Sequence, residues 1–279
     1  MKITILKLVL AFILASASPA ICQQASLRAG IDGTFAPHAM PNMKGGLEGF
    51  NIDLVEALGK QLGVKIQVDN VQFSGLVPGL QSGVYDFIAA PVTVNKERAD
   101  SLLFSEGYIN TDFQFAILKN TPDIKSLNEL KGKSIAVNKG STYDQWARGQ
   151  AENVGWNVES YGTTVDAVQA VMSGRAYAIL IGNTAAAWAV KNNTAIKLSL
   201  INSTGLVFAF PVRKDNLQLR EKIDLALECM KHDGVIAKLH EKWFGIKPDA
   251  QSASVVIYAG LGVPGMPGYD PKPHQLSCK

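Results

Sequence analysis

The sequence has little net charge and no concentration of basic residues. It carries 27 Lys and Arg against 24 Asp and Glu among 279 residues, so the formal net charge is only +3. A protein that binds nucleic acid usually presents a basic stripe that follows the phosphate backbone. The near balance of charge therefore argues against nucleic acid as a partner.

Sequence motifs of the common enzyme classes are also missing. There is no Walker phosphate loop, no His-Glu-x-x-His zinc motif and no Gly-x-Ser-x-Gly nucleophile motif. The four histidines, at positions 38, 232, 240 and 274, do not have the spacing of metal ligands. We therefore expect no cofactor, no metal ion and no catalytic residue.

Cysteine is scarce, and the positions of the three cysteines indicate whether the protein works in an oxidising compartment. Cys22 lies near the N-terminus, whereas Cys229 and Cys278 form an even pair further along the chain. In an oxidising compartment such a pair can bridge, and we predict a disulfide that fastens the tail to a late helix. The alternative is two unrelated thiols, one of them buried on its helix.

The N-terminus has the features of a secretory signal peptide. Lys2 and Lys7 precede an apolar run over 8–14, and small residues follow over 15–20. The apolar run is too short to span a bilayer, so we predict a cleaved signal peptide over 1–22 and export to the periplasm. A lipid anchor is disfavoured because the bulky Ile21 precedes Cys22.

Short apolar runs rich in β-branched residues alternate with amphipathic helical stretches along most of the chain. This order is typical of βαβ units and predicts an α/β fold of mostly parallel sheets flanked by helices. Strands are expected at 27–31, 65–68, 85–90, 113–118, 134–137, 176–181 and 206–212. Helical periodicity predicts helices from a cap at Asn51 to Gly63, from 164 to 174, from 216 to 234, and from there to Gly245.

The last segment, 247–279, has a different character. It contains too many Gly and Pro residues for a helix or a central strand, so we predict an irregular C-terminal extension. Its apolar part, 255–261, is expected to lie along the surface of the fold, with membrane contact as the alternative.

Several short motifs follow one another between residues 27 and 245. They are GIDGTFAP at 30–37, LEGFNIDL at 47–54, FSGLVPGLQSG at 73–83, TVNKERA at 93–99, LNELKGK at 127–133 and KWFG at 242–245. Each motif is weak alone. The ordered set resembles the amino-acid-binding branch of the periplasmic solute-binding proteins that serve ABC transporters.

The resemblance implies a two-lobed periplasmic-binding-protein fold with hinge crossings near 110–114 and 203–207. Lobe 1 would consist of 25–112 plus 207–246, and lobe 2 of 113–206, with the extension outside both. A monomer would bind a small molecule, an amino acid or a derivative, in the cleft. It would then close about the hinges and present this ligand to an ABC-transporter permease.

The resemblance also implies an anion site in the cleft. Arg98 would bind the ligand's α-carboxylate, because a guanidinium is planar and permanently charged. Thr93 and the loop 139–143, with Ser141 and Thr142, would add hydroxyl and amide donors. From its neighbours alone, Arg98 is more typical of a solvated helix charge, and the loop is as typical of a Gly turn before a helix.

Aromatic walls are implied at Phe35 and Phe73, on either side of the ligand's side chain. Read singly, each of these residues is more typical of a core. Asp32 would meet a polar or cationic part of the ligand, although a carboxylate at the end of a strand can equally accept from local backbone donors.

One position departs from the family pattern. An Asp that receives the ligand's ammonium group is expected after the strand at 176–181, but Gly182 stands there. A buried ammonium without a carboxylate is costly. Either Asp32, or Asn183 with the carbonyls of Ala90 and Pro91, compensates, or the ligand is not a plain α-amino acid.

Two other functions compete with transport. The first is an enzyme on the same fold, similar to cyclohexadienyl dehydratases, for which His38 would be the local acid or base. The second is an accessory or sensory subunit that binds a ligand but does not deliver it to a permease.

Overall fold

The computed structural model describes residues 26–278, and the predicted signal peptide lies outside them. The helices are α1 Phe50–Leu62, α2 Phe73–Gln81, α3 Lys96–Ser101, η1 Leu127–Leu130, α4 Thr142–Val154, α5 Thr164–Met172, α6 Asn183–Asn192, α7 Leu217–His232 and α8 Val235–Phe244. The strands are β1 Ser26–Ile31, β2 Met40–Pro41, β3 Leu47–Glu48, β4 Lys65–Asn70, β5 Phe87–Ile88, β6 Val92–Thr93, β7 Leu102–Phe104, β8 Ile109–Leu118, β9 Ser134–Asn138, β10 Asn157–Tyr161, β11 Ala178–Gly182, β12 Ile196–Ala209 and β13 Pro211–Arg213. None of the helices described over 26–278 is both long and apolar enough to cross a bilayer.

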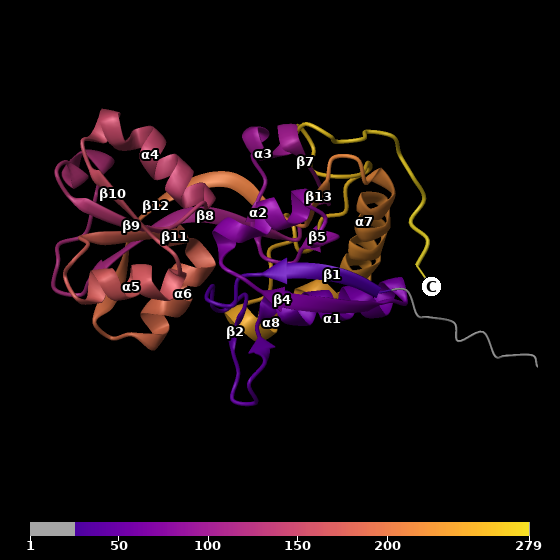
Figure 1. The fold of residues 1–279 in the computed structure, drawn as a ribbon, viewed down its shortest axis with the longest axis horizontal. Helices are drawn as coiled ribbons and strands as arrows, with labels where there is room; N and C mark the ends of the chain where they lie inside the picture. Colours follow the sequence, from indigo (N-terminus) through magenta and orange to yellow (C-terminus); the bar gives the residue numbers. More distant parts are fainter. Residues whose placement is uncertain (1–25, 279) are drawn as a thin grey trace, which may run out of the picture.

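Two separate sheets form the two lobes of the molecule (Figure 1). The first sheet has the strand order β4-β1-β5-β13-β7, and helices α1, α2, α7 and α8 belong to its lobe. The second sheet has the order β10-β9-β11-β8-β12-β6 and carries α4, α5 and α6. The predicted two-lobed α/β fold is therefore present.

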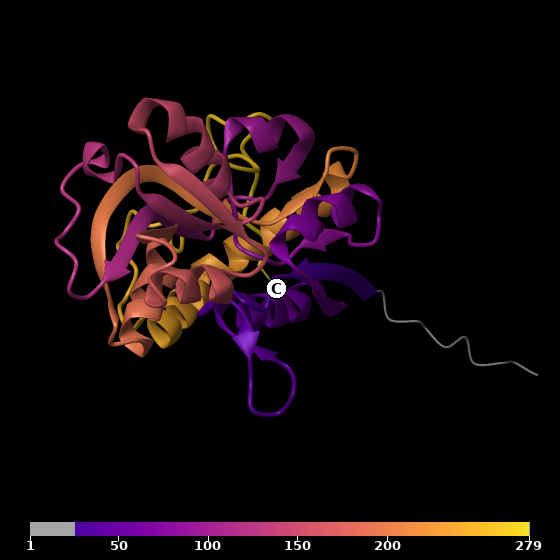
Figure 2. The ribbon, with the colours of Figure 1, turned by 60° about the vertical axis from the view of Figure 1, so that its left-hand side comes forward.

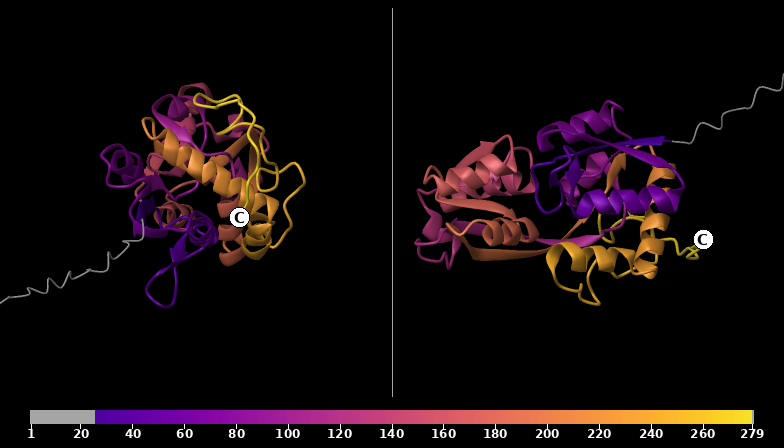
Figure 3. Two further views of the ribbon diagram at one scale, coloured as in Figure 1. Left: turned by 90° about the vertical axis from the view of Figure 1, so that its right-hand side faces the viewer. Right: turned by 90° about the horizontal axis from the view of Figure 1, so that it is seen from below.

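Two long strands join the lobes. Strand β12 pairs with β8 in the second lobe and, at its far end, with β6, where Phe208 faces Thr93. Its register against β8 shifts between Leu198 and Ile201 and again between Asn202 and Leu206. Figure 2 shows the resulting curvature of β12, and Figure 3, from below, shows the strands running between the lobes.

The sheets are mixed, and this corrects the expectation of mostly parallel sheets. Pairings of β1 with β4 and β5, and of β9 with β10 and β11, are parallel. Strands β7, β8, β12 and β13 pair antiparallel. The reason is that β8 carries the chain from the first lobe to the second and β12 carries it back. The two strands therefore run in opposite directions.

Most helix ends follow the predicted signals. Asn216 caps α7 by accepting from the Leu219 amide, and Gly63 ends α1 in the left-handed conformation at φ 67°. The predicted cap at Asn51 is wrong. Gly49 precedes α1 instead, and the Asn51 side chain is fully buried, where its amide nitrogen donates to the Ala89 carbonyl and the Tyr108 hydroxyl.

Residues 246–278 of the extension form no helix and lie along α7 (Figure 3). Cys229 of α7 is bonded to Cys278, with the Cα atoms 5.4 Å apart, so the predicted disulfide is confirmed and the alternative of two unrelated thiols is wrong. Lys231 donates to the carbonyl of Val256, and the amide of Ala253 donates to Asn110 of β8. The extension is thus fastened both to the first lobe and to the strand that leaves it.

Candidate functional site

A small cavity lies between the two lobes. It is lined from the first lobe by Asp32, Phe35, Phe73, Ala90, Pro91, Thr93 and Arg98, and from the second lobe by Asn138, Ser141, Thr142 and Tyr143. The structure thus brings together all the ligand-binding residues expected from the sequence except Asn183. Asn183 does not line the cavity, and its side-chain oxygen accepts from the Asp112 amide at 3.2 Å.

Asn138 lines the cavity but was not among the expected residues, and Tyr143, which belongs to the expected loop 139–143, lines it although no role was assigned to its side chain. Asn138 ends β9 directly after the predicted strand at 134–137, and Tyr143 closes the loop 139–143. Both could have been found from the rule that ligands bind beyond the carboxyl ends of parallel strands. Asp32 after β1 and Ala90 after β5 follow the same rule.

Arg98 is a buried cation without an acidic partner among the described residues. Its side chain is held by hydrogen bonds to the carbonyls of Thr93 and Gly140, each 3.2 Å long, and it lies over the Phe73 ring at 5.7 Å. Burial lowers its pKa to about 10, and the guanidinium therefore remains charged at neutral pH. A buried cation of this kind is stabilised by an anion that enters the cavity.

Helix α4 begins at the cavity and adds backbone donors. Ser141 caps it by accepting from the Asp144 amide at 3.1 Å, and Thr142 and Tyr143 form its first turn. The first amides of a helix have no partner within the helix and carry partial positive charge. The cavity therefore combines Arg98 from one lobe with a helix N-terminus from the other.

The first-lobe wall is aromatic and carries one carboxylate. Phe35 is 8% exposed and stacks on His38 with the ring centroids 5.3 Å apart. One oxygen of Asp32 accepts from both the amide and the hydroxyl of Thr34, at 2.9 and 2.7 Å. Local donors thus hold the Asp32 carboxylate in place, while the residue still lines the cavity.

The lobes touch each other in this conformation. The Thr164 amide donates to the Thr34 hydroxyl at 3.2 Å, and Arg98 reaches the Gly140 carbonyl across the cleft. A third contact joins His38 of the first lobe to Thr184 of α6 at 2.8 Å. The molecule is therefore in a closed arrangement, with the cavity enclosed by both lobes.

His38 is a structural residue and does not line the cavity. Its Nδ1 lies 3.0 Å from Asn51 Oδ1, which can only accept, so we assign the proton to Nδ1. Nε2 is then free to accept from the Thr184 hydroxyl. Neither ring nitrogen is available to act as an acid or base on a molecule in the cavity.

The pKa of His38 leads to a pH prediction. Burial lowers this pKa from 6.5 to about 4, although the bond to Asn51 opposes the change. Because the folded-state pKa is depressed, the contribution to stability is complete above pH 6.5 and is lost as the pH falls towards 4. We expect this loss to be at most about 3 kcal/mol.

Urea unfolding at pH 7 and pH 4.5 tests this expectation. His38→Gln should lose less stability between the two pH values than the wild type does. His232→Gln is the control, because His232 is 62% exposed and should follow the wild type. Equal pH dependence in His38→Gln and the wild type would contradict the assignment.

Comparison with known proteins fits this architecture. Residues 27–246 match the bacterial extracellular solute-binding proteins, family 3. The chain belongs to this family. The family 3 match covers both lobes and the cavity and ends where the C-terminal extension begins.

Curated relatives from Escherichia coli strain K12 are binding proteins and not enzymes. The L-cystine-binding protein TcyJ is 30% identical over 229 residues, which cover 80% of this chain and 84% of TcyJ. The ABC transporter arginine-binding protein 1 is 29% identical over 245 residues, covering 85% of this chain and 98% of the relative.

Solved structures agree with the fold. An ancestral arginine-binding protein bound to arginine is 38% identical, with a TM-score of 0.76, and the match covers 79% of this chain and 98% of that protein. An ancestral arginine-binding protein bound to glutamine gives a TM-score of 0.75 at the same identity and coverage. The similarity to these binding proteins therefore holds for the three-dimensional fold as well as for the sequence.

Proposed function

We propose that this protein captures an amino acid, or a close derivative with a free carboxylate, and delivers it to an ABC-transporter permease. The observation that carries the proposal is Arg98, a buried cation without an acidic partner over 26–278, in a cavity enclosed by two lobes. The relatives bind cystine, arginine or glutamine, all of which carry a carboxylate. Because these ligands have different side chains, they do not indicate which amino acid this protein binds.

In this proposal the ligand bridges the lobes. Its carboxylate pairs with Arg98, assisted by Thr93 and by the first turn of α4 with Ser141 and Thr142. Phe35 and Phe73 enclose its side chain, and Asp32 with the carbonyls of Ala90 and Pro91 meets its polar groups. Because the ligand contacts both lobes, it stabilises the closed form, which the permease can then recognise.

The same proposal includes the bounds of the lobes, which are 25–112 plus 207–246 for lobe 1 and 113–206 for lobe 2. It also includes the cellular location of the protein. We infer that residues 1–22 direct export and are removed, so that the protein works in the periplasm and its disulfide forms there. A cyclohexadienyl-dehydratase-like activity has less support, because His38 does not reach the cavity.

A thermal-shift screen against the amino acids and their N-acylated and 2-hydroxy counterparts tests the proposal. A ligand at 100 times its Kd adds roughly 2.7 kcal/mol of stability, which raises the Tm of a protein of this size by roughly 5–10 °C. We expect at least one compound with a free carboxylate to give such a shift. No shift across the panel would overturn the proposal.

A further inference from the structure

The hydroxyl of Tyr143, a residue that lines the cavity, fills the space beside Gly182. Gly182 ends β11 with φ −62° and ψ 141°, a conformation that any residue adopts. A Cβ atom at Gly182 would lie 2.5 Å from the Tyr143 hydroxyl oxygen and 3.5 Å from Thr111 Oγ1. Glycine at position 182 therefore makes room for the hydroxyl of Tyr143.

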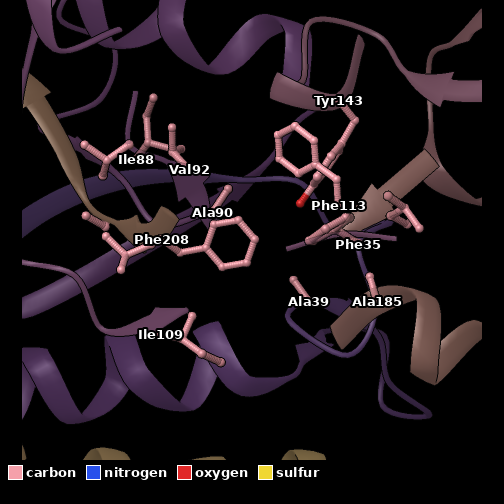
Figure 4. Close-up of a cluster of buried hydrophobic side chains, with 14 of the residues drawn as sticks. Phe35, Ala39, Ile88, Ala90, Val92, Ile109, Phe113, Tyr143, Ala185 and Phe208 are labelled. Carbon is pink, nitrogen blue, oxygen red and sulfur yellow. The ribbon is translucent and has the colours of Figure 1, made fainter. Parts of the chain in front are cut away.

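Figure 4 shows Tyr143 beside Phe113, with its hydroxyl oxygen near Phe35 in the same cluster. The rings of Tyr143 and Phe113 meet edge to face at 5.2 Å. Packing against Phe113 holds the ring, while Tyr143 also lines the cavity. The hydroxyl is thus held in a fixed position at the edge of the cavity, against Gly182.

Several buried polar atoms on this wall make no well-formed hydrogen bond to any residue from 26 to 278, although the Tyr143 hydroxyl lies beside the hydroxyls of Thr111 and Thr93. At the cavity they are the Tyr143 hydroxyl, Thr142 Oγ1 and Asn138 Oδ1, and behind it Thr111 Oγ1 of β8, which does not line the cavity. None of these residues is more than 6% exposed. A buried polar atom without a partner is unfavourable, so this grouping at the cavity indicates that a ligand completes their hydrogen bonds.

The second-lobe wall is also uncharged. Asp32 and Arg98, both from the first lobe, are the charged residues that line the cavity. Burial raises the pKa of Tyr143 to about 12, which keeps its hydroxyl neutral. Neutral hydroxyls and an amide can pair with a hydroxyl, a carbonyl or an amide N–H, whereas a buried ammonium needs a carboxylate. The carboxylate that lines the cavity, Asp32, belongs to the first-lobe wall, where Thr34 occupies one of its oxygens.

We propose that Tyr143, together with Thr142 and Asn138 on the same wall, forms a subsite for an uncharged hydrogen-bonding group beside the ligand's carboxylate. This inference rests on the proposed function and narrows its ligand class to carboxylates that carry a hydroxyl or an acylated nitrogen in place of a free ammonium. The presence of glycine rather than an acidic residue at 182 is then a feature of specificity.

Calorimetry with three compounds that share one side chain tests the subsite: the free amino acid, its N-acetyl form and its 2-hydroxy acid. The side chain is that of the strongest carboxylate in the thermal-shift panel. We expect the wild type to bind one of the uncharged forms at least about tenfold more tightly than the free amino acid. Tyr143→Phe should reduce this preference about tenfold, the effect of losing one hydrogen bond.

The ratio of affinities separates recognition from a structural role. If Tyr143 only helps to hold the lobes together, Tyr143→Phe will weaken all three compounds equally, and the proposal is overturned. A wild-type preference for the free amino acid would also overturn it, while leaving the proposed function intact. Absence of binding by every carboxylate would instead overturn the proposed function and the subsite with it.

A double-mutant cycle of Gly182→Ala and Tyr143→Phe, measured by the Tm without ligand, tests whether the Tyr143 hydroxyl fills the space beside Gly182. Gly182→Ala should lower the Tm of the wild type, because the new methyl group meets the Tyr143 hydroxyl. In the Tyr143→Phe background, where the oxygen is gone, the same substitution should lower the Tm much less. An equal loss in both backgrounds would contradict the claim that the hydroxyl fills this space.

Discussion

Arg98→Ala is expected to lose at least about 100-fold in ligand affinity, measured by calorimetry with the best compound of the panel. Removing one partner of a buried ion pair costs about 3–5 kcal/mol, and each 1.4 kcal/mol is a tenfold change in Kd. Arg98→Lys should fall between Ala and the wild type, because it keeps the charge but loses the planar pair of donors.

The stability of unliganded Arg98→Ala should behave differently from its affinity. Arg98 has no acidic partner among the described residues, so its removal relieves a buried charge, and we expect a Tm no lower than that of the wild type. Arg175→Ala is the matched control, because Arg175 is exposed and donates to nearby Ser173. Unchanged affinity in Arg98→Ala would exclude Arg98 from the site.

Lys231→Met is expected to destabilise the protein by about 3–5 kcal/mol at pH 8, measured by urea unfolding. Lys231 of α7 forms an ion pair with Glu106 at 2.8 Å, and both side chains are fully buried. Burial raises the pKa of Glu106 to about 7 even with the lysine present. Without Lys231, Glu106 at pH 8 must either stay charged and unpaired or take up a proton at a free-energy cost.

The destabilisation by Lys231→Met should be smaller at pH 6, where Glu106 is protonated more easily. The double variant Glu106→Gln/Lys231→Met should recover much of the loss, because no charge is left without a partner. Lys222→Met on the exposed face of α7 is the control and should stay within about 0.5 kcal/mol of the wild type. A similarly small effect of Lys231→Met would show that the ion pair contributes little.

Local patterns in the sequence predicted the elements that depend on local rules. Apolar runs became β1, β4, β9 and β11, and Gly63 and Gly245 ended their helices as expected. Strand β12 was found only at its end, because its first half alternates exposed and partly buried residues. That half is a strand because it pairs with β8.

Tertiary contacts decided the cases that the sequence could not. Asn51 looks like a helix cap, yet it is buried between His38 and Tyr108, which are distant in sequence. Arg98 lies between acidic neighbours that suggest a solvated charge, and only the fold turns it towards the cavity. The relation between Tyr143 and Gly182 depends on a helix and a strand that meet in three dimensions, so no local pattern predicts it.

A crystal structure of the protein with the best-binding carboxylate would test the central claim most directly. We expect the ligand in the cavity between the lobes, with its carboxylate oxygens within hydrogen-bond distance of the Arg98 guanidinium and its side chain between Phe35 and Phe73. A ligand bound outside this cavity, or one whose carboxylate points away from Arg98, would contradict the proposed site.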